Sequence, residues 1–206
     1  MCIRDRRYGI GRLTSAQANG VTYQYHYNAL GQIRLVSTSI QYNTLQTTAN
    51  IGYSYNNGLL TEIQYPSGAK IKYGYTLGNV TSVQLETLDD QGQPVVQSLA
   101  SNISYLPFGG MTGLTYGNNK TLSMSYDLDY LLTGKTVSGV IDKSYLHNPL
   151  GDISSITDTL QTSENQSFVY DELQRLTNGQ GAYGNLEFAY DSVGNRTSKT
   201  IDAVPE

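Results

Sequence analysis

Tyr190-Asp191-Ser192-Val193-Gly194-Asn195-Arg196-Thr197 is the clearest copy of a pattern that recurs along this chain. A second clear copy begins at Tyr170, where Asp171 follows directly and Arg175 comes four residues later. In both copies an aromatic residue closes an apolar stretch, and a turn-forming residue comes next. We call this aromatic residue the anchor of the repeat.

Weaker copies extend the pattern towards the N-terminus. Neighbouring anchors are 20 to 30 residues apart, as in the steps from 170 to 190 and from 75 to 105. A period near twenty with a fixed turn signature indicates a repeat array, whose function must be argued from the assembly. The six weaker anchors are Tyr27, Tyr55, Tyr75, Tyr105, Tyr126 and His147.

The residues before each anchor alternate between apolar and polar, as Ile71, Tyr73 and Tyr75 do with Lys70 and Lys72. A period of two predicts a half-buried strand, and glycine after the anchor predicts a tight turn. Each unit is therefore expected to be a hairpin, and residues 8–201 an all-β array of stacked antiparallel hairpins. The expected turn residues are Gly31, Gly58, Gly78, Gly109, Gly151, Gly194 and Asn195.

Two polar stretches interrupt this regularity. Asp89 to Pro94 lies in the widest gap between anchors and predicts a longer connection. Residues 159–167 are the best helical candidate, but they are short and polar and are expected to form a loop.

The composition fits an all-β chain with many turns. Of 206 residues, 18 are Tyr and 21 are Gly, and the formal net charge is −4. Tyr favours strands, and Gly supplies the positive φ angles of tight turns. No run of Lys or Arg suggests a nucleic-acid partner, and no apolar run reaches the length of a membrane-spanning helix. A single cysteine, Cys2, excludes a disulfide framework and a cysteine metal site within the chain.

The ends of the chain do not follow the repeat. Residues 1–7 are basic without an apolar segment behind them, so they are not a signal peptide. We expect them to be an irregular or non-native leader, and residues 202–206 to be a short tail.

The copies at Tyr170 and Tyr190 closely resemble the YD repeat of the Rhs family, and the resemblance extends over about residues 8–201. That family includes bacterial Rhs and wall-associated polymorphic toxins, the shell-forming C component of insecticidal toxin complexes, and animal teneurins. Asp follows the anchor only at Tyr126, Tyr170 and Tyr190, so the other copies are divergent.

The resemblance implies that the hairpins form a spiralling, curved sheet, part of a larger hollow shell that encloses a C-terminal effector in toxin members. An Arg-Tyr-Tyr-Asp-Pro core segment of the family is missing after Arg196. With about nine units at most, the chain is expected to be one piece of a longer protein, whose remaining repeats and enclosed effector would be its partners. The full-length protein would be bacterial and either secreted or exposed at the cell surface.

Asp127, Asp171 and Asp191 could be read as catalytic or calcium-binding carboxylates. Because they recur at one position of the repeat, we favour a structural role in which each accepts hydrogen bonds from nearby backbone N–H groups. Arg175 and Arg196 could bind phosphate or glycan, but pairing with a nearby Asp or packing on a Tyr ring is favoured. His147 is expected to replace an aromatic anchor and not to bind a metal.

The tyrosine rows leave one binding alternative open. Rows of Tyr on a sheet can stack sugar rings, whereas Tyr residues that alternate onto one face can also form cross-strand pairs. We favour the second interpretation. The leading hypothesis is a structural shell segment that encloses or presents a toxin or effector, with no chemistry of its own and no cofactor. The alternatives are a module that binds carbohydrate or cell surfaces and, with least support, a self-cleaving protease.

Overall fold

The computed structural model describes residues 8–202, which form seventeen β-strands and one 3₁₀ helix of three residues. The prediction of an all-β, antiparallel fold is confirmed. The expected leader 1–7 and most of the tail lie outside the described residues, and β17 continues to Asp202. The elements are β1 Ser15–Ala18, β2 Val21–Tyr27, β3 Ile33–Tyr42, β4 Leu45–Asn56, β5 Leu59–Gln64, β6 Lys70–Thr76, β7 Asn79–Leu88, β8 Pro94–Tyr105, β9 Met111–Tyr116, β10 Thr121–Tyr126, β11 Leu132–Val137, β12 Ile141–His147, β13 Ile153–Asp158, η1 Thr162–Glu164, β14 Gln166–Tyr170, β15 Leu176–Gly181, β16 Gly184–Tyr190 and β17 Arg196–Asp202.

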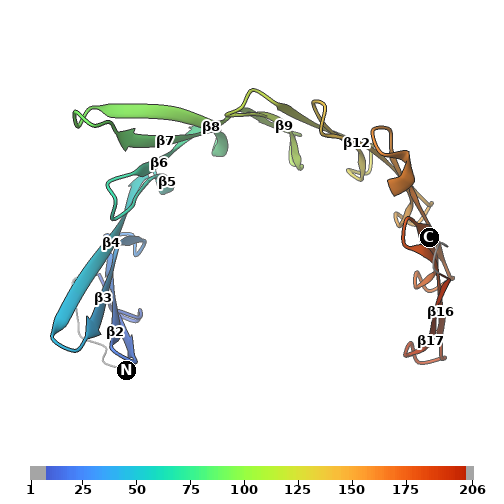
Figure 1. Cartoon of the computed structure of the whole chain (residues 1–206), viewed down its shortest axis with the longest axis horizontal. Helices are drawn as coiled ribbons and strands as arrows, with labels where there is room; N and C mark the ends of the chain where they lie inside the picture. Colours follow the sequence, from blue (N-terminus) through green and yellow to red (C-terminus); the bar gives the residue numbers. More distant parts are fainter. Residues whose placement is uncertain (1–7, 203–206) are drawn as a thin grey trace. The chain divides into compact units, whose positions relative to one another are not determined.

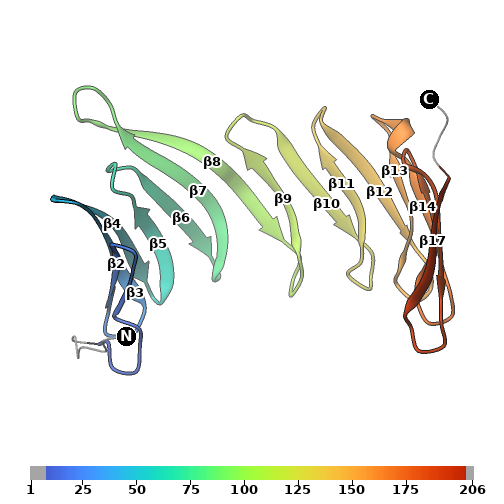
Figure 2. The same cartoon turned by 60° about the horizontal axis from the view of Figure 1, so that its bottom comes forward.

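The chain divides into two compact units, and the boundary in the sequence falls between Asn102 and Ile103. In the first, each strand from β1 to β7 pairs antiparallel with the next one in sequence, ending at β8. In the second, the same serial pairing runs from β9 to β17. Figure 1 colours the strands in this order, and Figure 2 shows β5, β6 and β7 side by side.

Nine turns of the described chain share one five-residue geometry. The N–H of turn residue 1 donates to the carbonyl of residue 5, and the N–H of residue 4 donates back to the carbonyl of residue 1. In eight of the nine this is a type I turn followed by a left-handed residue, the geometry of a three-residue hairpin loop. The nine turns are 28–32, 65–69, 89–93, 106–110, 116–120, 127–131, 148–152, 171–175 and 191–195.

Turn residue 4 carries the positive φ in eight of these turns, and Gly31, Gly151 and Gly194 occupy it as expected. Gly58 and Gly78 instead close two-residue turns, where they and the residues before them have positive φ. Gly109 also lies in a turn, but it does not carry the positive φ. In the turn 106–110 the preceding residue Phe108 takes the left-handed conformation, with φ 59°. Pro107 occupies the position before it, which is the arrangement of a type II turn.

Seven of the eight anchors stand at a register shift between their strand and the following one. At Tyr170, for example, the pairing skips one residue of β15, so that Val169 opposes Asn178 and Tyr170 opposes Leu176. Such a bulge bends the strand and increases its twist where the turn begins. The seven anchors are Tyr27, Tyr55, Tyr75, Tyr126, His147, Tyr170 and Tyr190.

The two wide gaps between anchors are filled by longer strands. β3 and β4 have 10 and 12 residues, as do β7 and β8. The expected long connection at Asp89 is therefore wrong: residues 89–93 form an ordinary five-residue turn. The stretch 159–167 is also not a loop throughout, because it holds η1 and the start of β14.

The sheets bury very little completely. Among the described residues the buried apolar side chains are Leu122, 6% exposed, and Val137, 8% exposed, which oppose each other on β10 and β11. On β14, Phe168 and Tyr170 are half-buried while Val169 on the other face is 55% exposed. On the face of the sheet that carries the anchors, side chains of adjacent strands therefore shield one another from solvent. This confirms half-buried strands but not a deep core.

Candidate functional site

In six repeats the hydroxyl group of the anchor tyrosine donates a hydrogen bond to a backbone carbonyl of the preceding strand or of the residues just before it. Tyr190 Oη donates to the carbonyl of Leu176 at 2.9 Å, and Leu176 is the first residue of β15. We call this contact the anchor hydrogen bond. Tyr190 and Leu176 both lie at strand ends that border a turn. The other pairs are Tyr27 with Leu13, Tyr55 with Ile33, Tyr75 with Leu60, Tyr126 with Met111, and Tyr170 with Ile153.

These hydroxyls lie in partly dry surroundings. Burial raises the pKa of Tyr55, and the nearby Tyr53 adds a smaller effect. Burial also raises the pKa of Tyr170, with a further contribution from the negative charge of Asp152. At neutral pH these hydroxyls are therefore protonated and able to donate.

The Asp after the anchor organises its turn. Oδ1 of Asp171 accepts the N–H groups of Leu173 at 3.0 Å and Arg175 at 2.9 Å. These bonds, led by the backbone N–H of Arg175, hold the pKa of Asp171 below its ordinary value. Six described turns use an Asp or Asn in this way, at positions 28, 89, 127, 148, 171 and 191.

The second side-chain atom of this Asp or Asn binds the side chain of turn residue 5 in four of the turns. Asp191 Oδ2 accepts Asn195 Nδ2 at 3.0 Å, and this bond is the largest cause of the lowered pKa of Asp191. Asp171 Oδ2 pairs with Arg175 through Nε and a terminal nitrogen, both at 2.7 Å. Asn28 with Gln32 and Asn148 with Asp152 are the remaining pairs.

Residue 5 also reaches the next repeat. A terminal nitrogen of Arg175 donates to the carbonyl of Asp191 at 3.1 Å, and the guanidinium lies 4.7 Å from the centre of the Tyr190 ring. Gln32 similarly donates to the carbonyl of Gly58 at 2.8 Å. The side chain of turn residue 5 thus contacts both its own turn and the next hairpin.

Arg196 does not repeat this role. It occupies the position after turn residue 5, so its guanidinium lies 5.9 Å from the ring of Phe188 within its own hairpin. Arg175 is turn residue 5, whereas Arg196 follows turn residue 5. The two arginines therefore differ by one position in the repeat, although both come shortly after a Tyr-Asp pair.

Arg12 has a role that the repeat pattern does not predict. Its guanidinium lies 5.7 Å from the Tyr27 ring, and it packs so closely on Gly31 that a Cβ there would collide with it. Gly11-Arg12-Leu13-Thr14 matches Gln174-Arg175-Leu176-Thr177 at three positions, which is the signal that could have revealed it.

A charged ladder crosses β5, β6 and β7 in the first unit. Lys72 lies 2.5 Å from Glu86, and Lys70 lies 3.7 Å from Glu62. The hydrogen bond from Lys72 lowers the pKa of Glu86, and the same bond raises the pKa of Lys72. Each charge has an opposite charge beside it, so this face is balanced and offers no charged patch to a ligand.

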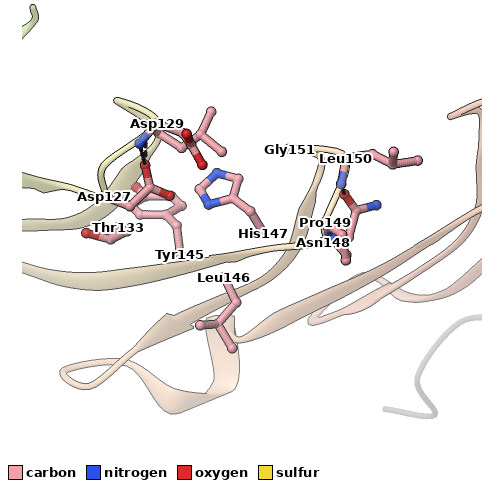
Figure 3. Close-up of a pocket in the computed structure, with 11 residues that line it drawn as sticks. Asp127, Asp129, Thr133, Tyr145, Leu146, His147, Asn148, Pro149, Leu150 and Gly151 are labelled. Carbon is pink, nitrogen blue, oxygen red and sulfur yellow. Dashed lines mark hydrogen bonds between the residues drawn. The ribbon is translucent and has the colours of Figure 1, made fainter.

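The one repeat whose anchor is histidine borders a hollow of about 500 Å³ in the second unit. It lies between the turn 127–131 and the turn 148–152, as Figure 3 shows. His147 and Tyr145 project to the side that holds Asp127 and Asp129, while Leu146 projects to the other.

Two kinds of site are not found in residues 8–202. No group of three or more His, Cys, Asp or Glu side chains there is placed to hold a metal ion. That part of the chain also contains no helix long and apolar enough to cross a membrane.

No protein-family model matches this chain, and no curated protein matches it in sequence. Solved structures do match its fold. A crystal structure of TcdB2-TccC3-Cdc42 aligns with a TM-score of 0.77 at 16% identity, covering 94% of this chain and 12% of that chain. A crystal structure of TcdB2-TccC3 gives 0.77 at 15% identity with the same coverage. The Photorhabdus luminescens Tc holotoxin pore gives 0.76 at 16% identity, again with 94% and 12% covered.

The chain therefore has the fold of a segment of these toxin-complex chains, of whose length it spans 12%. At this level of identity the likeness concerns the fold.

Proposed function

We propose that this chain is a structural segment of an Rhs-type repeat shell. The observation that carries the proposal is the alignment of 94% of the chain with TcdB2-TccC3 chains at a TM-score of 0.77. This is an inference from fold similarity, because the function of a fold depends on the sites it carries. The role would be to wall off or present a toxin or effector, with no chemistry of its own.

The anchor hydrogen bonds favour the proposal of a structural shell segment. A tyrosine that donates to the neighbouring hairpin makes each unit depend on the one before it, as in repeat proteins stabilised by contacts between adjacent repeats. The hydroxyls are thereby engaged within the sheet, and the anchor rings that could stack on sugars are half-buried. The Tyr rows thus favour the shell over the carbohydrate-binding alternative.

The proposal extends to partners and location. In the full-length protein the partners would be further repeats of the same polypeptide and an enclosed C-terminal effector, and the protein would be secreted or exposed at the cell surface. These statements rest on the resemblance to toxin-complex chains.

Electron microscopy of the full-length gene product tests the proposal. We expect a hollow particle in whose wall the hairpins of residues 15–202 follow one another, together with an interior segment that resists added protease. A particle without a closed wall that binds glycans, with binding lost in Tyr190→Ala, would instead establish the carbohydrate-binding function. Mass spectrometry of the incubated protein checks the absence of chemistry, since a reproducible internal cut would reveal a self-cleaving protease.

A further inference from the structure

Three residues that border the hollow beside His147 depart from the pattern of the other repeats. Turn residue 5 is Leu131, which cannot pair with the second oxygen of Asp127. The anchor is His147 and not tyrosine, and turn residue 3 adds a second carboxylate, Asp129. Departures from an otherwise consistent pattern are expected at functional positions.

A later pair of turns in the same unit shows what chemistry the space between two turns accepts. There the guanidinium of Arg175 is held by the second oxygen of Asp171, the carbonyl of Asp191 and the ring of Tyr190. It fills the space between two consecutive turns. Arg12 lies in the corresponding place against Tyr27 and Gly31 in the first unit.

The same three groups border the hollow. Asp127 has its first oxygen engaged by the N–H groups of Asp129 and Leu131, both at 2.9 Å, so the second can face a ligand. Asn148 and His147 correspond to Asp191 and Tyr190. Leu131 lies against Gly151 much as Arg12 lies against Gly31, but it brings no donor.

We propose that the hollow binds a guanidinium group supplied by a ligand. The planar guanidinium pairs with Asp127 and Asp129, donates to the carbonyl of Asn148 and lies against the ring of His147. Two carboxylates select a cation, and the fork of donors favours guanidinium over ammonium. Because both carboxylates are exposed, binding is weak for a single side chain and is strengthened when several contacts are linked.

Titration of the ¹⁵N-labelled chain with N-acetyl-argininamide tests this proposal. Saturable shifts are expected at the N–H groups of Asp129, Leu131 and Leu150, with at least about tenfold weaker binding of the neutral isostere N-acetyl-citrullinamide. The lysine analogue should bind with intermediate affinity. Equal affinities for arginine and citrulline, or no saturable shift up to about 10 mM, would overturn the proposal.

Two variants locate the binding. Leu131→Arg supplies the guanidinium from within the chain and should abolish arginine binding, whereas Leu160→Arg adds the same charge away from the hollow and should leave it. Asp129→Asn should weaken binding about tenfold, and its control Asp90→Asn should not. Binding that survives both Leu131→Arg and Asp129→Asn contradicts the assignment, even if the chain binds arginine elsewhere.

A further titration with a peptide distinguishes the two possible sources of the guanidinium group. A Gly-Ser-Arg-Ser-Gly peptide that binds more tightly than N-acetyl-argininamide assigns the site to an arginine of a polypeptide. Equal affinity assigns it to a free guanidinium compound.

Discussion

At the scale of single residues, the anchor tyrosine has two separable functions. Its ring covers the sheet surface, and its hydroxyl donates to a carbonyl of the neighbouring hairpin, as Tyr55 does to Ile33 at 2.8 Å. The ring could be foreseen from the alternating pattern. The hydroxyl contact could not, since Tyr55 and Ile33 are separated by 22 residues and their approach depends on strand register.

Tyr55→Phe should therefore lower the free energy of unfolding by about 1 kcal/mol, the usual net value of one hydrogen bond. The ring remains, and only the donor is lost. Urea denaturation followed by circular dichroism measures the change. Tyr42→Phe is the control, because Tyr42 is 73% exposed. Equal effects of the two changes would mean that the anchor hydroxyl does not stabilise the fold.

His147→Tyr should act in the opposite direction. Anchor tyrosines donate to the start of the preceding strand, so a hydroxyl at this position can reach the carbonyl of Leu132, the first residue of β11. We expect about 0.5–1.5 kcal/mol of added stability in the same urea assay. Leu146→Tyr, on the opposite face, controls for added aromatic area. A destabilised His147→Tyr chain would show that this repeat has a different geometry.

At the scale of elements, the hairpin turn depends on its Asp or Asn. Asp171 accepts two backbone N–H groups and pairs with Arg175, and Asp191 repeats the arrangement with Asn195. The turn positions were predictable from Asp, Asn and Gly spacing, and a turn-organising role for Asp was the favoured interpretation. The link from Arg175 to Tyr190 was only partly foreseen, because the motif does not specify which ring lies beside the guanidinium.

These turns should make stability depend on acid pH. The pKa values of Asp171 and Asp191 are lower in the folded chain than the ordinary value of about 3.9. Their contribution is complete above that value and is lost as pH falls through the folded pKa values. The urea midpoint should therefore decrease below about pH 4.

A double variant, Asp171→Asn with Asp191→Asn, should show a smaller decrease, while the control Asp90→Asn keeps the acid response of the natural chain. An unchanged acid response in the double variant would mean that other carboxylates control it.

At the scale of the whole molecule, each unit is a series of hairpins in which every strand pairs along its edges with its neighbours in sequence. Within the described residues, β17 pairs only with β16, and all seven of its residues are exposed. A strand with an unpaired edge can pair with a further strand.

The isolated chain should consequently self-associate in a concentration-dependent manner, as measured by sedimentation velocity. Ile201→Lys places a charge on the edge strand and should reduce association. Val193→Lys makes the same charge change in an exposed turn and should not. A monodisperse natural chain at all concentrations would contradict this prediction.

The sequence by itself determined the all-β hairpins, because alternation and turn residues act within a few positions of one another. The same local patterns are the basis on which the anchors, the turn aspartates and the turn glycines were predicted. The tertiary structure alone decided the anchor hydrogen bonds, the different roles of Arg175 and Arg196, and the hollow beside His147. These features arise between neighbouring hairpins, where strand length, bulges and a one-residue offset decide which groups meet.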